Sequence, residues 1–234
     1  MQRGGWAWWG PMVLAVVVLA AGCSILGDGP PAPGSPTRAQ VEALLGAARV
    51  IDKRPHPGGY QRGCRNDEGC VFGPAWSDDY DGRGGHDGCD TRNNVLQGQL
   101  SGVSHRPGTR DCVVLAGILQ DPYTGKRITF DKSRAREVQI DHIYPLAAAW
   151  DMGAATWPLP QRIRFANDID FNLLAVDGAT NEDKGDSTPA DWLPPARAYR
   201  CFYAGKYLTA ATQYDLPITL ADREALHRAA RGCA

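Results

Sequence analysis

The sequence predicts an α+β fold, in which a small set of antiparallel strands is combined with helices and stabilised by disulfides. An apolar, β-branched run at residues 112–119 is followed by a turn sequence at 121–125 and a second strand-like run at 127–130. Helical start signals recur later in the chain. Apart from Cys23, the six cysteines form an even set, which is typical of a disulfide framework in an exported protein.

The first part of the chain predicts export rather than structure. Arg3 precedes an apolar run at residues 11–21, and small residues lead into Cys23. This pattern is typical of a bacterial lipoprotein signal, so residues 1–22 are predicted to be removed and Cys23 to carry lipid. An uncleaved membrane anchor is the alternative, although the run is short for a spanning helix of about 20 residues. We expect an extracytoplasmic protein, either a membrane-anchored lipoprotein or a secreted one.

The mature chain is predicted to hold one domain. Residues 23–36 are rich in proline and glycine and form a tether, and residues 37–234 suffice for a single core. Thr37 is placed to cap an amphipathic helix. Residues 54–88 read as surface loops, whose aspartates fit no EF-hand spacing.

Further elements are predicted from alternation and from proline. Residues 138–142 alternate as a strand does, and Pro145 and Pro160 each begin a helix. A short helix is expected at 179–184, and two longer helices near 195–212 and 220–231.

The net charge of the chain limits how the protein can bind a polyanion such as nucleic acid. The net charge is −1, and loss of Arg3 with the leader takes it to −2, which argues against nucleic-acid binding by a basic body. A local basic cluster precedes Asp141, and it is either a phosphate-binding patch or a solvated face. Its members are Lys126, Arg127, Lys132, Arg134 and Arg136.

The chemistry is concentrated in three short motifs. Asp141 and His142 begin the first, Asn172 opens the second, and Asn181 begins the third, which ends in Lys184 and Gly185. Hydrolysis of a phosphodiester needs a base and a cation. A neutral imidazole supplies the base, and the oxygen ligands Asp141 and Asn181 suit Mg²⁺ or Mn²⁺. Neighbouring strand residues point to opposite faces, so Asp141 and His142 can share a site only where the strand ends.

The order of these motifs resembles the HNH (ββα-metal, or His-Me finger) endonuclease family. Residues 165–168, 184–186 and 191–194 resemble its secreted branch, related to the C-terminal domain of GmrSD-type restriction enzymes, and the resemblance covers roughly residues 59–233. It implies a ββα-metal core with added helices. The implied roles are His142 as general base, Asp141 and Asn181 as metal ligands, Asn172 as the residue that holds the loop bearing the base, and Lys184 as a residue that faces phosphate.

Two further expectations rest partly on the resemblance. Arg92 lies in a segment similar to a motif of the same branch and is expected to clamp the scissile phosphate; a structural ion pair with Asp90 or a neighbouring residue is the alternative. Sequence proximity and the resemblance together favour three disulfides, and the absence of any Cys-x-x-Cys argues against zinc. The pairs are Cys64–Cys70, Cys89–Cys112 and Cys201–Cys233.

The sequence therefore predicts an exported, divalent-metal-dependent endonuclease that acts on nucleic acid, DNA rather than RNA, with little sequence preference. Mg²⁺ is the expected metal, with Mn²⁺ second. The alternatives are a lipid-anchored envelope binding protein with a degenerate nuclease fold and another metal-dependent phosphoesterase. Purely structural roles also compete: Asp141 and His142 as a hydrogen-bonded pair, Asn181 as a helix cap, and Asn172 as a turn residue.

Overall fold

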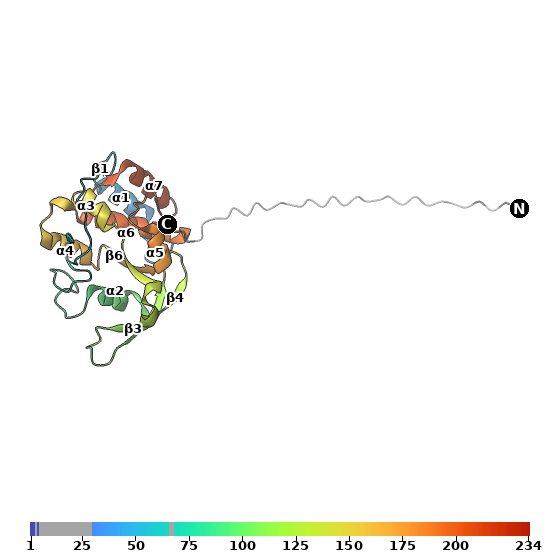
Figure 1. Cartoon of the computed structure of the whole chain (residues 1–234). Helices are drawn as coiled ribbons and strands as arrows, with labels where there is room; N and C mark the ends of the chain where they lie inside the picture. The colour runs from blue at the N-terminus through green and yellow to red at the C-terminus, as the bar shows by residue number, and fades with distance from the viewer. Residues whose placement is uncertain (3, 5–29, 66–67) are drawn as a thin grey trace.

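The computed structural model describes residues 1, 2, 4, 30–65 and 68–234. The predicted leader cleavage and the lipidation site at Cys23 lie outside these residues. Helices gather at one end of the molecule and the strands β3 and β4 at the other, with β6 and α5 between them (Figure 1). None of the helices described has the length and apolar character that a membrane span requires.

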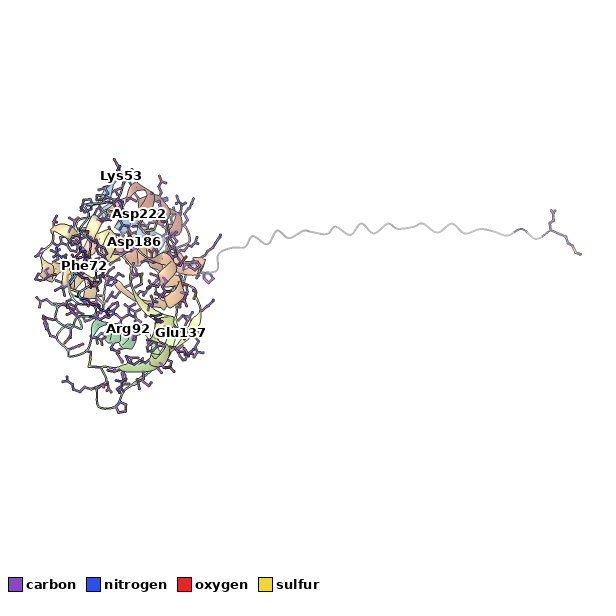
Figure 2. The ribbon with its side chains drawn as sticks, viewed as in Figure 1. Lys53, Phe72, Arg92, Glu137, Asp186 and Asp222 are labelled. Atoms are coloured by element: carbon purple, nitrogen blue, oxygen red, sulfur yellow. A yellow bond between two sulfur atoms is a disulfide. The ribbon has the colours of Figure 1, made fainter. Side chains whose placement is uncertain are left out.

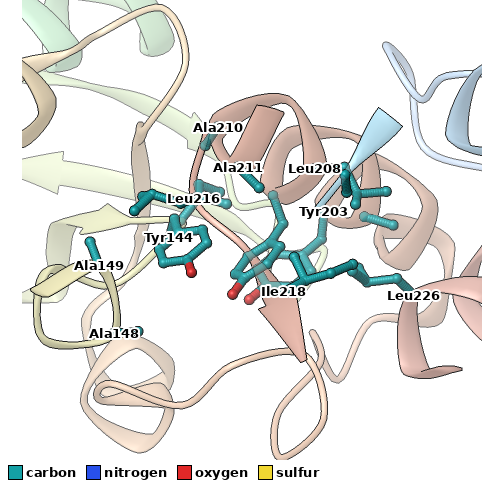
Figure 3. Packing of buried hydrophobic residues seen from close by; sticks show 14 of the residues in the cluster. Tyr144, Ala148, Ala149, Tyr203, Leu208, Ala210, Ala211, Leu216, Ile218 and Leu226 are labelled. Atoms are coloured by element: carbon teal, nitrogen blue, oxygen red, sulfur yellow. The ribbon is translucent and has the colours of Figure 1, made fainter. Parts of the chain in front are cut away.

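The helical half is built around a large apolar core. Tyr144 and Tyr207 stack with ring centroids 4.9 Å apart, and Leu208, Ile218 and Leu226 pack in the same cluster (Figure 3). Burial of these apolar side chains stabilises the helices far more than the intrinsic helix propensity of their residues does. The helices of this half are α1 (Arg38–Ala47), α3 (Leu146–Asp151), α4 (Leu159–Asn167), α6 (Arg200–Gln213) and α7 (Leu220–Ala230).

The strands form separate small sheets. An antiparallel sheet has the order β2-β3-β4, β5 pairs antiparallel with β6, and a short parallel pair joins β1 to β7. The strands are β1 (Val50–Ile51), β2 (Ser101–His105), β3 (Val114–Gln120), β4 (Arg127–Asp131), β5 (Val138–His142), β6 (Leu173–Asp177) and β7 (Ile218–Thr219). Short 3-10 helices are η1 (Lys132–Glu137), η2 (Ala154–Thr156) and η3 (Arg197–Tyr199).

Strand β6 separates the two cores of the molecule. Leu173 and Ala175 point into the core shared with β3 and α2 (Thr91–Gln99), whereas Leu174 and Val176 point into the helical core. Side chains alternate across a strand, so a strand covered on both faces is apolar at nearly every position. This double burial holds β5 firmly, because β5 pairs with β6 along its whole length.

Helix α5 (Gly178–Lys184) follows β6 without a connecting loop. It packs on both β5 and β6, and Gly178 allows it to approach η1 closely, since a Cβ there would lie 2.0 Å from the Arg136 carbonyl oxygen. Gly185 ends the helix at a φ of 53°, a conformation that glycine adopts readily. The order strand, strand, helix thus brings the first and third sequence motifs together.

The three predicted disulfides are confirmed: Cys64–Cys70, Cys89–Cys112 and Cys201–Cys233. The first lies within the long segment between β1 and β2, where no regular strand or helix but α2 occurs among the described residues. The second joins Cys89, just before α2, to Cys112 in the loop between β2 and β3. The third ties the C-terminus to α6. These links stabilise segments that bury little apolar surface of their own.

Most of the predicted elements are confirmed within a few residues. Thr37 caps α1 with a full capping box, and Pro145 immediately precedes α3. The helix α2, the strands β2 and β6 and the parallel pair β1–β7 were not predicted. Within the predicted tether of residues 23–36, the Ala32 amide donates to the Ala198 carbonyl at 2.8 Å and Ala32 is buried.

Candidate active site

A cleft of about 870 Å³ lies where β5 ends. One side of it is formed by β5, the start of α3 and α5, and another by residues 60–64, 75 and 76. Asp141, His142 and Asn181 all line it. The strand ends at His142, so two neighbouring residues that would point apart within a strand both reach one cavity.

His142 is held in one orientation by its surroundings. Its Nε2 lies 2.8 Å from the carbonyl oxygen of Ala166, and a carbonyl accepts only from a protonated nitrogen, so Nε2 carries the proton. Trp76 stacks on the ring with centroids 5.8 Å apart and planes 10° from parallel. No hydrogen-bond partner for Nδ1 occurs among the described residues, which leaves its lone pair for a ligand in the cleft.

The pKa of His142 is lowered to about 3. Burial is the largest cause, the hydrogen bond to Ala166 opposes it, and the positive charges of Arg62 and Lys184 lower it further. The imidazole is therefore neutral throughout the neutral and mildly acidic range. An anionic ligand beside it would offset the two cations and raise the pKa.

Asn172 braces the segment that follows His142. Its side-chain oxygen accepts from the Tyr144 amide at 2.9 Å, and its backbone carbonyl accepts from the Ile143 amide at 2.9 Å. Its side-chain amide donates to Phe165 at 3.4 Å, and the residue is fully buried. Asn172 thus fixes the path of the chain that carries His142 and stays out of the cleft.

Asp141 forms a buried ion pair with Lys184. The two groups are 2.9 Å apart, and their side chains are 7% and 0% exposed. Lys184 also donates to the His142 carbonyl at 3.1 Å, and the Tyr123 hydroxyl donates to Asp141. Burial raises the pKa of Asp141, while both hydrogen-bonded partners oppose that rise. The expectation that Lys184 faces phosphate needs correction, because its ammonium is used inside the protein.

Asn181 lies inside α5 rather than at its start. Its side-chain amide donates to Gln139 at 2.8 Å, which leaves its carbonyl oxygen on the cleft side without a partner among the described residues. Asp177 caps the helix instead, accepting from Thr180. The alternative role of Asn181 as a helix cap is therefore excluded.

Arg92 is not among the residues that line the cleft. Its guanidinium donates to the carbonyls of Ala135 and Val138 at 3.0 and 2.8 Å, so it ties α2 to the start of β5. Figure 2 shows it in the strand-rich half, with Asp186 nearer the helices. No ion pair between Arg92 and Asp90 occurs among the described contacts, and Asp90 caps α2 by accepting from Asn93. The expectation that Arg92 clamps the scissile phosphate needs correction, because its guanidinium is used inside the protein.

The basic cluster forms a neighbouring groove of about 660 Å³. Lys126, Arg127, Arg134 and Arg136 line it, whereas Lys132 does not, and Glu182 borders both this groove and the cleft. Arg134 is paired with Glu137 at 2.9 Å. Part of the cluster is therefore compensated inside the protein.

The part of the chain that carries these motifs matches a known protein family. Residues 90–229, which include β5, β6, α5 and all three motifs, match the model of the GmrSD restriction endonucleases, C-terminal domain. The chain belongs to this family. The match covers more than half of the chain and begins at the N-cap of α2.

Relatives of this GmrSD C-terminal domain protein add little about activity. An uncharacterized secreted protein of Arthroderma benhamiae is 38% identical over 144 residues, which is 59% of this chain and 65% of the relative. The chain thus spans just under two thirds of that relative. No solved structure matches.

The donor set of the cleft suits a hard divalent cation. Asp141 supplies carboxylate oxygens and Asn181 a carbonyl oxygen, and Mg²⁺ prefers both. Lys184 and Tyr123 already engage the carboxylate, so a metal would share it with an ammonium group and bind weakly. Among the described residues no group of three or more His, Cys, Asp or Glu side chains could hold a metal; this includes the acidic loop at residues 78–90.

Two residues of the GmrSD-family cleft were missed from the sequence. Arg62 and Trp76 come from the loops before the family match, some 70 residues ahead of His142 along the chain. Nothing in their local pattern marks them. Only the Cys64–Cys70 pairing, which fixes a compact loop, pointed to this segment as ordered.

Proposed function

We propose that this protein is a divalent-metal-dependent endonuclease that hydrolyses phosphodiester bonds of nucleic acid, DNA in preference to RNA. Membership of the GmrSD restriction endonuclease C-terminal domain family supports nuclease chemistry. The observation that carries the proposal is the state of His142, a neutral imidazole that lines the cleft, with its Nε2 proton donated to the Ala166 carbonyl and no partner for Nδ1 among the described residues. The site belongs, on this proposal, to the ββα-metal type formed by β5, β6 and α5.

His142 would act as the general base. Its Nδ1 accepts a proton from water as that water attacks phosphorus, and the Ala166 carbonyl stabilises the imidazolium that forms. Burial, with the smaller effect of the Arg62 and Lys184 charges, lowers the pKa of His142 to about 3, so the imidazole alone is a weak base. A bound phosphate would raise this pKa by offsetting the two positive charges. Asn172 keeps the imidazole at the strand end, since its hydrogen bonds define the following turn.

Asp141 and Asn181 would hold the metal. When bound, Mg²⁺ supplies positive charge for the phosphate and the departing oxygen. The protein offers one carboxylate and one amide oxygen, so substrate phosphate and water complete the coordination. Lys184 donates to both the Asp141 carboxylate and the His142 carbonyl. It thereby fixes the positions of the proposed metal ligand and the proposed base relative to each other.

Metal dependence is the direct test of this proposal. The purified, oxidised protein is expected to nick plasmid DNA in Mg²⁺ or Mn²⁺, to stop in EDTA, and to show a rate that rises with metal up to millimolar concentration. Asn181→Ala should raise the Mg²⁺ concentration needed for the half-maximal rate, since it removes one of the proposed ligands. The assay is agarose-gel conversion of supercoiled plasmid, run beside single strands, RNA and a small phosphodiester.

Cleavage by the wild type in excess EDTA would contradict the metal assignment. Hydrolysis of the small phosphodiester alone would identify a phosphoesterase of another specificity. The absence of any divalent-ion binding, measured by calorimetry, would favour a binding protein with a degenerate site.

We propose further that the protein works outside the cytoplasm. Three disulfides favour an oxidising compartment, and the fungal relative is described as secreted. The leader predicts cleavage before Cys23 and lipid on that cysteine. Mass spectrometry of the mature protein from a lipoprotein-processing host should show the lipid on Cys23 and its loss in Cys23→Ser; an intact leader would contradict it.

A further inference from the structure

Residues 60–64, 75 and 76 form a wall of the cleft that lies outside the family match. The match begins at residue 90, yet six cleft residues precede it. They are Tyr60, Arg62, Gly63, Cys64, Ala75 and Trp76. The cleft of this protein is thus completed by residues outside the matched region.

The wall is a small closed loop with Arg62 at its base. The Cys70 amide donates to Gly63 at 2.9 Å and the Val71 amide to Gln61 at 3.1 Å, so two backbone rungs flank Arg62. The Cys64–Cys70 disulfide closes the loop beyond them. The Arg62 guanidinium donates through Nη1 to the Gly73 carbonyl at 2.9 Å. The hydrogen bonds and the disulfide of the loop therefore fix the position of the Arg62 guanidinium.

Arg62 is a positively charged residue of the cleft that forms no ion pair among the described residues. Two of the carboxylates that line the cleft are paired with cations, Asp141 with Lys184 at 2.9 Å and Asp186 with Arg54 at 3.0 Å, and Glu182 accepts from the neutral Gln139 amide at 2.8 Å. Arg62 has no carboxylate within ion-pair distance among the described residues. A half-buried charge without a counter-ion costs free energy, and an anion in the cleft would remove that cost.

We propose that Arg62 binds the phosphate that lies beside His142. The inference rests on the proposed function and deepens it. A guanidinium presents paired donors that match two phosphate oxygens, and one Arg62 donor already anchors it to Gly73. Arg62 and His142 line the same cleft. In this arrangement Arg62 takes the phosphate-binding role that the sequence had suggested for Arg92.

Binding without turnover tests this inference separately from catalysis. A fluorescent DNA duplex is titrated in EDTA with the wild type, Arg62→Gln, Arg62→Lys and the control Arg65→Gln. Arg65 is an exposed arginine of the same loop and does not line the cleft. Arg62→Gln should weaken binding about 10- to 100-fold, Arg62→Lys less, and Arg65→Gln by no more than about twofold. Circular dichroism melts establish that each variant is folded.

Steady-state cleavage in Mg²⁺ gives a second readout. Arg62→Gln should raise KM more than it lowers kcat, and the double variant Cys64→Ser/Cys70→Ser should show a smaller change in the same direction, because it loosens the loop but keeps the arginine. Equal binding by folded Arg62→Gln, Arg62→Lys and Arg65→Gln would overturn the role of Arg62 even if the wild type cleaves DNA. Arg62-dependent binding by a protein that cleaves nothing would instead overturn the proposed endonuclease.

Discussion

His142→Ala is expected to lower the rate of plasmid cleavage by about 10²- to 10⁴-fold, the usual effect of removing a general base. The Nδ1 of His142 is the acceptor that the cleft presents, and the hydrogen bond from Nε2 to Ala166 keeps that acceptor free of its proton. The measurement is initial nicking rate at saturating Mg²⁺. Circular dichroism should show an unchanged fold, because His142 lies at a strand end and lines a cavity.

His227→Ala is the matched control for this variant. His227 is exposed on α7, in the helical half, and does not line the cleft. It should cleave at the wild-type rate. A folded His142→Ala protein that nicks plasmid as fast as His227→Ala would eliminate His142 as the base.

The pH dependence follows from the same residue. The pKa of His142 in the folded protein is about 3, well below its ordinary value of 6.5. Between these values the unfolded chain binds a proton that the folded chain excludes, so this group makes the protein less stable as pH falls from 6.5 towards 3. His142→Ala should remove that contribution. In urea titrations at pH 7 and pH 5, the free energy of unfolding of the variant should therefore fall less on acidification than that of the wild type.

Breaking the buried pair is expected to have the largest effect on stability. Lys184→Met leaves the Asp141 carboxylate in a site where it is 7% exposed, and Asp141→Asn leaves a fully buried ammonium. Removing one partner of such a pair typically costs about 3–5 kcal/mol. Both variants should also lose cleavage, because Lys184 joins Asp141, the proposed metal ligand, to the His142 carbonyl.

A double-mutant cycle separates the pair from the residues themselves. Asp141→Asn combined with Lys184→Met removes both charges, so its loss of stability should be clearly smaller than the sum of the single losses. Urea unfolding in EDTA excludes any contribution from metal. Additive losses would show that the two side chains act independently, contrary to their 2.9 Å separation.

At β5 the prediction from the sequence agrees with the structure. Alternation over residues 138–142 and Pro145 sufficed to predict a strand that ends where Asp141 and His142 can share a site. The strand β6 was missed because burial on both faces removes the alternation that identifies a strand. The helix α2 was missed because its nine residues hold few apolar positions, and its stability comes from packing on the second core.

The sequence by itself determined the α+β class, the disulfide pairs together with the family resemblance, most helix starts, and the motifs that meet at the cleft. These depend on local periodicity, capping and short-range cysteine spacing. Only the tertiary structure decided what each polar side chain contacts. Lys184 could be placed near phosphate from its motif, but its ammonium is buried on Asp141. Arg92 was assigned to substrate, whereas Arg62 reaches the cleft, because a disulfide-closed loop distant in sequence is brought there by packing that no local pattern encodes.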